Sequence, residues 1–408
     1  MSARVPDFRI DIEGALVPAE LRASVTSVNH STSLEGADRV EVSLVNEGLR
    51  WLDHPLLALD NDLELWMGYA GELKRVFVGE IVSREANFPS GGQPVLTFCA
   101  QDRRHRLAGA AKNRVFPIPI PGVGNYPIPD IGVATFVSAE NALLPAFDPV
   151  GAAISVIVGG IEAAGAAGDV QAAQKMVRAQ IEESDYDFLT RISRENGWDM
   201  VVEHAGPLGG YVLRFFSSLD QLTEYARFRY GESLIEFTPR ISKVGSIINV
   251  SAHVFISAIK LMLRITVGWD FDRMALTLMV VPSIAPVPEQ GGSSPKSFEY
   301  FGPQTPYSSA RKILGHLLPK LNNRLTASGS VVGDPTLSAG KVIAIEGVGR
   351  EFGGLYRIKS AEHSLDSSGY TTRFDLRKEV WFGSIPLPEQ GALPLPPPIR
   401  ADLPLIPH

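Results

Sequence analysis

The feature that most constrains the fold of this chain is a series of short segments between residues 8 and 101 in which apolar side chains alternate with others. A period of two is typical of strands that bury one face. Turn-forming clusters separate these segments at intervals typical of a sandwich or barrel. The segments are residues 8–12, 40–44, 63–67, 76–78 and 95–99. We therefore predict one antiparallel β-domain over residues 1–110.

Strand patterns return in the second half of the chain. Residues 234–237 and 247–250 are the clearest early segments, and residues 342–346, 356–358 and 372–376 follow later. We predict a second β-domain over residues 226–270 and 325–383. A helical insertion is expected over residues 271–324, because residues 308–322 carry an apolar face at helical spacing. The predicted fold class is mainly β with α insertions (α+β).

The region between the two β-domains, residues 111–225, has a mixed pattern. Alternate prolines in residues 115–121 cannot donate ladder hydrogen bonds, so we expect an extended linker or docking arm there. A helical pattern covers residues 170–183, and a second helix starts at Ser184, where Asp187 completes a capping box. Gly197 is expected to end that helix. A hairpin should join residues 200–202 to residues 211–215.

Residues 384–408 are rich in proline and include Pro396, Pro397 and Pro398. Consecutive prolines fit neither a helix nor a central strand. This tail is expected to extend away from the folded part.

Length and composition set the class of protein. At 408 residues, the chain has room for two to three domains, and its 45% hydrophobic and 20% charged residues are typical of globular proteins. The formal net charge of −7 argues against specific nucleic-acid binding. The single cysteine, Cys99, cannot form an intrachain disulfide. Glu162 interrupts the apolar residues 149–168, so we expect no membrane anchor.

Motifs for catalysis or cofactor binding are not evident. The glycines of residues 346–354 lie between two strands, whereas a phosphate-binding loop must open a helix. The eight histidines do not show metal-ligand spacing, and there is no Gly-x-Ser-x-Gly elbow. We therefore predict no catalytic residues, no metal and no cofactor. A catalytic group assembled from distant segments stays open as an alternative.

Three charged clusters admit a functional or a structural interpretation. Asp60, Asp62 and Glu64 lie at a turn, and residues 182–187 place four carboxylates at a helix start, where the helix dipole favours negative charge. We interpret both groups as solvated and structural. The basic cluster at the end of the first β-domain is interpreted as a surface or subunit interface, formed by Arg103, Arg104 and Arg106.

Three segments together resemble the phage late-control D family, which includes the central hubs of contractile tails and the hub half of type VI secretion spike proteins. The first segment is a Glu-Ser-Asp-aromatic-Asp-Phe-Leu helix start, and its motif residues are Glu183, Ser184, Asp185, Asp187, Phe188 and Leu189. The second resembles a C-terminal hairpin, with Gly347, Gly349, Phe352, Gly353, Tyr356 and His363. The third resembles the strand that closes the second barrel and contains Gly369 and Tyr370.

This resemblance implies a structural protein of a virion baseplate or tail-like particle, assembled in the host cytoplasm. It implies a homotrimer in which each chain contributes two tube-protein-like antiparallel β-barrels, so that six barrels join a hexameric tail tube to a trimeric spike. The implied partners are the tube protein, a separate spike protein and other baseplate (wedge) proteins, and the tape-measure protein is a further candidate. The proline-rich tail is a candidate for gripping the spike.

Two alternatives come from other classes. One is a tail-associated cell-wall hydrolase that uses a carboxylate pair such as Glu182 and Asp187. The other is a carbohydrate-binding tail protein, for which five tryptophans spread along the chain give little concentrated support.

Overall fold

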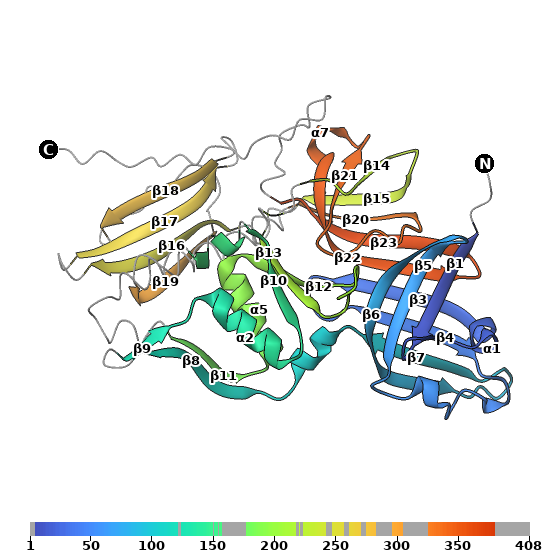
Figure 1. Cartoon of the computed structure of the whole chain (residues 1–408). Helices are drawn as coiled ribbons and strands as arrows, with labels where there is room; N and C mark the ends of the chain where they lie inside the picture. The colour runs from blue at the N-terminus through green and yellow to red at the C-terminus, as the bar shows by residue number, and fades with distance from the viewer. Residues whose placement is uncertain are drawn as a thin grey trace.

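The computed structural model describes most of the chain and is shown in Figure 1. The described residues are 5–120, 124–149, 151–153, 155–156, 177–217, 220, 223–241, 247–256, 261–270, 275–282, 296–304 and 325–379. The predicted helix at residues 308–322 and the proline-rich tail, with Pro396, Pro397 and Pro398, lie outside these residues.

A 13-stranded sheet runs through both predicted β-domains. We call its first part, residues 6–101, the N-terminal module. Its elements are β1 (Pro6–Ile12), β2 (Ala15–Leu16), α1 (Ala19–Ser24), β3 (Val25–Ser33), β4 (Arg39–Val45), η1 (Glu47–Leu49), η2 (Pro55–Leu57), β5 (Asp62–Tyr69), β6 (Glu72–Asn87) and β7 (Val95–Gln101). These strands cover the five alternating segments of the sequence, so the prediction of antiparallel strands there is confirmed.

The second part of the sheet we call the C-terminal module. It contains β14 (Ala226–Arg229), β15 (Leu234–Ile241), β20 (Leu325–Val332), β21 (Val342–Glu346), α7 (Gly349–Phe352), β22 (Gly354–Asp366) and β23 (Gly369–Arg377). Buried residues such as Ile343, Ile358 and Phe374 build its own core, distinct from the core of Ile10, Val42 and Phe98 in the N-terminal module. In both modules, the core lies on one face of each strand because the side chains alternate.

The two modules pair their strands in the same order. The N-terminal module runs β3-β4-β7-β6-β5-β1, and the C-terminal module runs β15-β20-β23-β22-β21-β14. Strands β3, β4, β7, β6, β5 and β1 therefore correspond to β15, β20, β23, β22, β21 and β14, and the corresponding strands also follow the same order along the chain. The last pair differs, because β1 is antiparallel to β5 whereas β14 is parallel to β21.

The correspondence extends to irregularities in the ladders. The β3–β4 ladder has a bulge after Val25, and the β15–β20 ladder has one after Leu234. The β6–β7 ladder has a bulge after Ile81, and the β22–β23 ladder has one after Ile358. Since bulges fix strand register and twist, shared bulges indicate two copies of one structural design.

The modules are joined by direct strand pairing. The residues of β22 from Ser360 to Leu365 pair antiparallel with the residues of β3 from Val28 to Ser33. The first half of β22 pairs instead with β21. Long strand β22 therefore belongs to its own module and extends the sheet into the other module.

A mixed unit, which we call the brace, lies between the modules in sequence and packs against both. Its helices and central sheet are η3 (Arg103–Ala108), α2 (Asp130–Glu140), β10 (Leu144–Phe147), α5 (Asp185–Asn196), β12 (Trp198–Glu203) and β13 (Val212–Ser217). A separate ribbon contains β8 (Lys112–Ile120), β9 (Gly124–Pro127) and β11 (Arg178–Glu183). The predicted β12–β13 hairpin and the helix that starts after Ser184 are confirmed.

Two expectations for this region are corrected. The described end of the predicted helix over residues 170–183 is strand β11, whose residues pair with β8. The proline-interrupted segment is also a paired strand, since Pro117 and Pro119 lie opposite β9. Alternate residues of a strand face the same edge, so both missing N–H groups fall on the same side of β8.

The second insertion differs from the predicted one. Four strands form a separate sheet, namely β16 (Ile247–Ile256), β17 (Leu261–Asp270), β18 (Ala275–Pro282) and β19 (Lys296–Gln304). Residues 247–270 were expected in the second barrel, and residues 275–304 in a helical insertion. Because these strands pair with one another, both predictions are wrong for the described residues of this region. Among the helices of the described residues, none has the length and apolar character needed to cross a membrane.

Candidate functional site: a buried polar junction

The basic cluster at the end of the N-terminal module is mostly buried, contrary to the predicted surface location. Asp102 caps η3 by accepting from the backbone N–H of Arg104. The short helix turns Arg103 and Arg104 inward, and both residues are buried. Arg106 stays partly exposed and pairs with Glu80. The predicted surface location is therefore wrong for Arg103 and Arg104, whose charges are neutralised inside the chain. A subunit contact of Arg106 stays a proposal.

Arg104 is the centre of the junction. Its guanidinium donates to Asp38 at 2.5 Å and to Asp102 at 2.9 Å, and it also reaches the carbonyl oxygen of Met200 on β12 at 3.1 Å. Burial alone would raise the pKa of the Asp38 carboxyl, but Arg104 and then His204 outweigh it and hold that pKa below its usual value. A fully buried charge pair of this kind needs every donor and acceptor satisfied.

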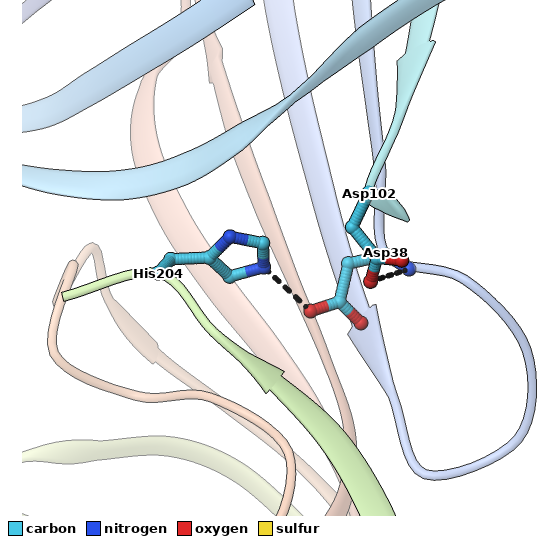
Figure 2. A group of neighbouring side chains, drawn as sticks. All are labelled: Asp38, Asp102 and His204. Atoms are coloured by element: carbon cyan, nitrogen blue, oxygen red, sulfur yellow. Dashed lines mark hydrogen bonds and ion pairs between the residues drawn. The ribbon is translucent and has the colours of Figure 1, made fainter. Parts of the chain in front are cut away.

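Asp38, Asp102 and His204 converge closely enough to suggest a metal site, as Figure 2 shows. The hydrogen bonds argue against one. His204 Nδ1 accepts from the backbone N–H of Val78 at 3.1 Å, so Nε2 carries the proton and donates to Asp38 at 2.9 Å. Both ring nitrogens are thus engaged, and Arg104 occupies oxygens of both carboxylates. A cation there would compete with a fixed guanidinium, so we assign the cluster a structural role.

Two further histidines continue the junction across the sheet. His30 on β3 and His363 on β22 lie directly opposite each other, with ring centroids 5.4 Å apart and planes 17° from parallel. His363 Nε2 donates to the Leu337 carbonyl at 2.9 Å, and its Nδ1 lies 3.0 Å from the Tyr370 hydroxyl. Burial lowers the pKa of His363 to about 4.

His30 has a different environment. It is 1% exposed, and neither ring nitrogen has a hydrogen-bond partner among the described residues. Burial lowers the pKa of His30 well below its ordinary value, and neighbouring His363 and His204 lower it further. This site accommodates a neutral ring that stacks on His363 and lies edge-on to Phe77.

The brace holds the N-terminal module through its hairpin loop as well. Arg75 on β6 donates to the carbonyl oxygens of His204 and Gly206. Arg103 lies under the ring of Tyr211, with the guanidinium carbon 3.8 Å from the ring centroid, and pairs with Asp62 and Glu80. Gly210 has a φ of 85° and packs against Val78, where a side chain would clash.

Ion pairs and a hydrogen bond also hold the brace to the C-terminal module. Arg377 on β23 pairs with Asp199 on β12. Arg357 on β22 is fully buried, pairs with Glu379 at 2.6 Å and donates to the Asp220 carbonyl at 3.0 Å. Buried polar contacts therefore tie the brace to the N-terminal module at one end and to the C-terminal module at the other.

The helix-start motif is a structural device. Ser184 caps α5 by accepting from the Asp187 N–H, so the predicted cap is confirmed. The Asp187 carboxylate accepts from the Ser184 hydroxyl, where a capping box would use the Ser184 backbone N–H. Gly197 ends the helix with a φ of 67°. Phe188 and Leu189 are buried in the brace core. Glu183 pairs with Arg191.

Asp185 is the buried member of this motif. It accepts from Lys112, Arg114, Asn141 and Gln180 at distances between 2.7 and 3.0 Å. Burial would raise the pKa of Asp185, but these hydrogen bonds, with Lys112 the largest, hold it below the usual value. The carboxylate thereby ties α5 to β8, β11 and the end of α2.

The residues of the other two motifs lie in the C-terminal module. Gly347 and Gly349 take φ values of 78° and 80° around the short helix α7, between β21 and β22. Phe352 and Gly353 end that helix, and Tyr356 on β22 donates to the Phe352 carbonyl. Gly369 takes a φ of 122° at the β22–β23 turn, and Tyr370 packs where Gly333 leaves room for its ring.

The carboxylates considered for catalysis do not form a paired site. Glu182 is exposed and lies at the β11 irregularity, whereas Asp187 accepts from the hydroxyl of the helix cap Ser184. In the other group, Asp62 contacts Arg103 and Glu64 contacts Arg75, while burial raises the pKa of Asp62. These carboxylates form ion pairs or lie at turns.

A polar groove of about 510 Å³ lies where the C-terminal module meets the end of β3 in the N-terminal module. Its charged lining residues are Glu35, Arg240, Lys359 and Asp375, and the remaining lining is mostly small hydroxyl side chains. Ser360 donates to Asp375 at 3.0 Å. The groove offers hydrogen bonds to a polar chain, and no histidine lines it.

Sequence reasoning missed the residues that complete the junction. Asp38, His30 and His204 stand alone in the sequence, far from the segments that they contact. The Asp102-Arg103 pair at the end of the first domain was the one available signal. The neighbouring Arg104 completes the junction through contacts made 66 and 96 residues away.

Comparisons of sequence give no assignment, because no protein-family model and no curated protein matches the chain.

Comparison of structures gives a clear result. A 43 kDa tail protein of prophage MuSo2 from Shewanella oneidensis matches with a TM-score of 0.60 at 12% identity, over 91% of this chain and 98% of that one. A tail protein from Neisseria meningitidis matches with a TM-score of 0.60 at 11% identity, over 93% and 99%.

A third match is an Escherichia coli component of the type VI secretion system, described as structurally similar to bacteriophage T4 tail proteins. It has a TM-score of 0.54 at 12% identity, over 95% of this chain and 80% of that one. The chain therefore has the fold of these tail proteins over nearly its whole length, and the predicted resemblance to tail hubs is confirmed at the level of fold.

Proposed function

We propose that this protein is the structural hub of a baseplate in a contractile phage tail or a related injection particle. The proposal rests mainly on the observation that one chain holds two modules with the same strand order and with bulges at two equivalent places. The fold shared with phage tail proteins and a type VI secretion component supports this assignment.

The proposed assembly is a homotrimer. Three copies of a chain with two similar modules present six similar units around a threefold axis, so one face matches a hexameric tube and the other a trimeric spike. The rigid junction suits this role, because a fixed angle between the modules determines whether a ring closes. The buried pairs of Arg104 and Arg357 support such rigidity.

The outer face of the sheet suits the wall of an aqueous bore. From β20 to β4, across the module boundary, the outward positions carry hydroxyl, amide and charged side chains. These residues are Thr326, Ser328, Ser330, Thr371, Arg373, Asp375, Ser360, Glu362, Ser364, Asn29, Ser31, Ser33, Arg39, Glu41 and Ser43. Protein interfaces are usually centred on aromatic or aliphatic anchors, which this stretch lacks.

The proposed partners are the tail tube protein, a separate spike protein, other baseplate (wedge) proteins and the tape-measure protein, in a particle assembled in the host cytoplasm. We propose that residues 386–408 grip the spike. Removing those residues and measuring spike capture tests this contact, and undiminished capture would refute it.

The proposed role is non-enzymatic. Glu182 and Asp187, the pair considered for a cell-wall hydrolase, are exposed, and Asp187 is committed to its cap. The described residues offer no specific observation in favour of a hydrolase or a carbohydrate-binding protein.

The decisive experiment is the mass and symmetry of the purified chain. Size-exclusion chromatography with light scattering should give three times the mass of one chain, and a particle reconstruction should place one trimer at the end of the tube. A monomer at all concentrations, together with a particle tip that lacks a threefold axis, would overturn the proposal.

A further inference from the structure

The contact between the modules within one chain provides a template for a contact between chains. In this junction, β3 pairs with the second half of β22, and Ser31 lies opposite Glu362, His30 opposite His363, and Asn29 opposite Ser364. The Ser364 hydroxyl donates to the Asn29 side chain at 2.8 Å.

The shared bulges assign the equivalent residues in the other module. Counting from the bulges after Ile358 and Ile81, Glu362 corresponds to Glu85, and Ser364 corresponds to Asn87. Counting from the bulges after Val25 and Leu234, Ser31 corresponds to Arg240 and Asn29 to Thr238. The β4–β7 and β20–β23 ladders give the same correspondence, since Arg39 faces Gln101 as Thr326 faces Arg377.

Both equivalent strands have a free edge among the described residues. The second half of β6 pairs with β7 on one side, while β5 pairs only with the first half. Strand β15 ends the sheet, and apart from a bridge between Leu234 and Tyr230 its described residues pair only with β20. Glu85, Asn87, Thr238 and Arg240 are exposed, whereas the central pair of the internal junction, His30 and His363, is buried.

We propose that β15 of one copy pairs antiparallel with the second half of β6 of a second copy, in the register of the internal β3–β22 junction. The inference rests on the proposed trimer and names the surface that builds it. Such a contact is heterologous, because two different edges meet, and a heterologous contact closes into a ring when the rotation matches the number of copies. Each copy then contributes one internal junction and one contact to the next copy.

The transferred register places complementary residues opposite each other. Glu85 faces Arg240, a carboxylate and a guanidinium that are both exposed in the single chain. Asn87 faces Thr238, which can repeat the Asn29–Ser364 hydrogen bond. Phe88, 57% exposed, lies opposite Phe237, which is half-buried. One register thus places a pair of opposite charges, a hydrogen-bonding pair and an apolar pair opposite each other. A slip of one residue would separate all three pairs.

A proline on the free edge of β15 limits unspecific association. Pro239, the equivalent of His30, lacks a backbone N–H, and prolines on free edges discourage unspecific strand addition. Its opposite residue in the proposed contact is Ala86, a small side chain that leaves room for the proline ring. The contact therefore depends on side-chain matching more than the internal junction does.

A disulfide provides the first test. Directly opposite residues have the spacing that a disulfide requires. The double variant Asn87→Cys with Thr238→Cys should, after mild oxidation of the full chain, give dimers and closed trimers on a non-reducing gel, while each single variant stays monomeric on that gel. Reduction should return all species to single chains.

Charge reversal provides the second test. Either Glu85→Lys or Arg240→Glu should weaken each contact by roughly tenfold, and the double variant should restore the trimer, as measured by light scattering. Glu72→Lys, at the opposite end of the same strand, is the matched control and should leave the trimer intact. Thermal unfolding of each variant identifies any that fail to fold.

The outcomes separate this inference from the proposed function. A trimer in which the double cysteine variant gives no cross-link and charge reversal has no effect would overturn the inference and leave the hub proposal standing. A chain that stays monomeric at every concentration and gives no cross-link would overturn both. Cross-linked trimers with restoration by the double charge reversal would establish the contact.

Discussion

His30 and His363 face each other across the β3–β22 ladder with stacked rings, at the place where the two β-modules become one sheet. Each ring is buried, and the groups around the pair come from several elements. His204 and Phe77 contact His30, and Tyr370 contacts His363. Asp38, Asp334 and Lys341 are near enough to influence the charge of the pair. The joint between the modules is therefore stable when these imidazoles are neutral.

The first prediction concerns pH. Burial lowers the pKa of His363 to about 4, against an ordinary value of 6.5, so the unfolded chain binds a proton in a range where the folded chain does not. The free energy of unfolding should therefore fall as pH decreases through 6.5 and level off below about 4. The loss from this residue is about 3 kcal/mol, and His30 adds to it in the same direction. Denaturant unfolding at pH 8, 6 and 4.5 measures how the free energy of unfolding changes with pH.

A variant separates this histidine from the carboxylates that also titrate in acid. His363→Gln keeps a donor for the Leu337 carbonyl and removes the titratable ring, so it should lose less stability between pH 8 and pH 4.5 than the natural chain. His54→Asn, which keeps the cap of η2 away from the joint, should behave like the natural chain. Identical pH profiles for all three would contradict the assignment.

The second prediction concerns the unpaired ring of His30. Its two nitrogens are buried without hydrogen bonds, and a buried polar group without partners is costly. His30→Phe keeps an aromatic ring against His363 and Phe77 and removes that cost. We expect the free energy of unfolding at pH 8 to rise by about 1 kcal/mol, after allowing for the slightly larger ring. A loss of stability would mean that an ordered water or another group satisfies His30.

Local patterns in the sequence predicted local structure well. The alternation at residues 40–44 and 95–99 became β4 and β7, and Ser184 became the cap of α5, because each signal depends on neighbours in the chain. Strand β11 was missed because its residues become a strand only by pairing with β8, which lies far earlier in the chain, and the pattern itself favoured a helix.

The junction could not be predicted for a related reason. Arg104 looks like one member of a surface basic cluster, and only the fold brings Asp38 and the Met200 carbonyl to it. The equivalence of the modules was predicted as a consequence of the resemblance, yet the shared bulges appear only in the ladders. In contrast, the separate sheet β16–β19 shows that strand patterns alone do not decide which sheet a strand joins.

The third prediction concerns the cap of α5. Ser184→Ala removes the acceptor for the Asp187 N–H and should reduce the free energy of unfolding by about 1 kcal/mol. Ser184→Asn, which also caps helices well, should recover most of the loss. Because α5 lies in the brace, hydrogen exchange should show the increased opening first at the start of this helix. A loss that Ser184→Asn fails to recover would indicate that the hydroxyl acts elsewhere.

The last prediction concerns the centre of the junction. Arg104 neutralises the buried carboxylates of Asp38 and Asp102, so Arg104→Met leaves both without their counter-charge. Breaking a buried ion pair from one side costs about 3 to 5 kcal/mol, and thermal or denaturant unfolding should show a loss of this size. Arg39→Met removes an exposed partner of Glu41 and should change stability by less than about 1 kcal/mol. If the junction also fixes the angle between the modules, a folded Arg104→Met chain should form trimers less completely than the Arg39→Met control. Equal stability in the two variants would mean that the buried network contributes nothing beyond a surface pair.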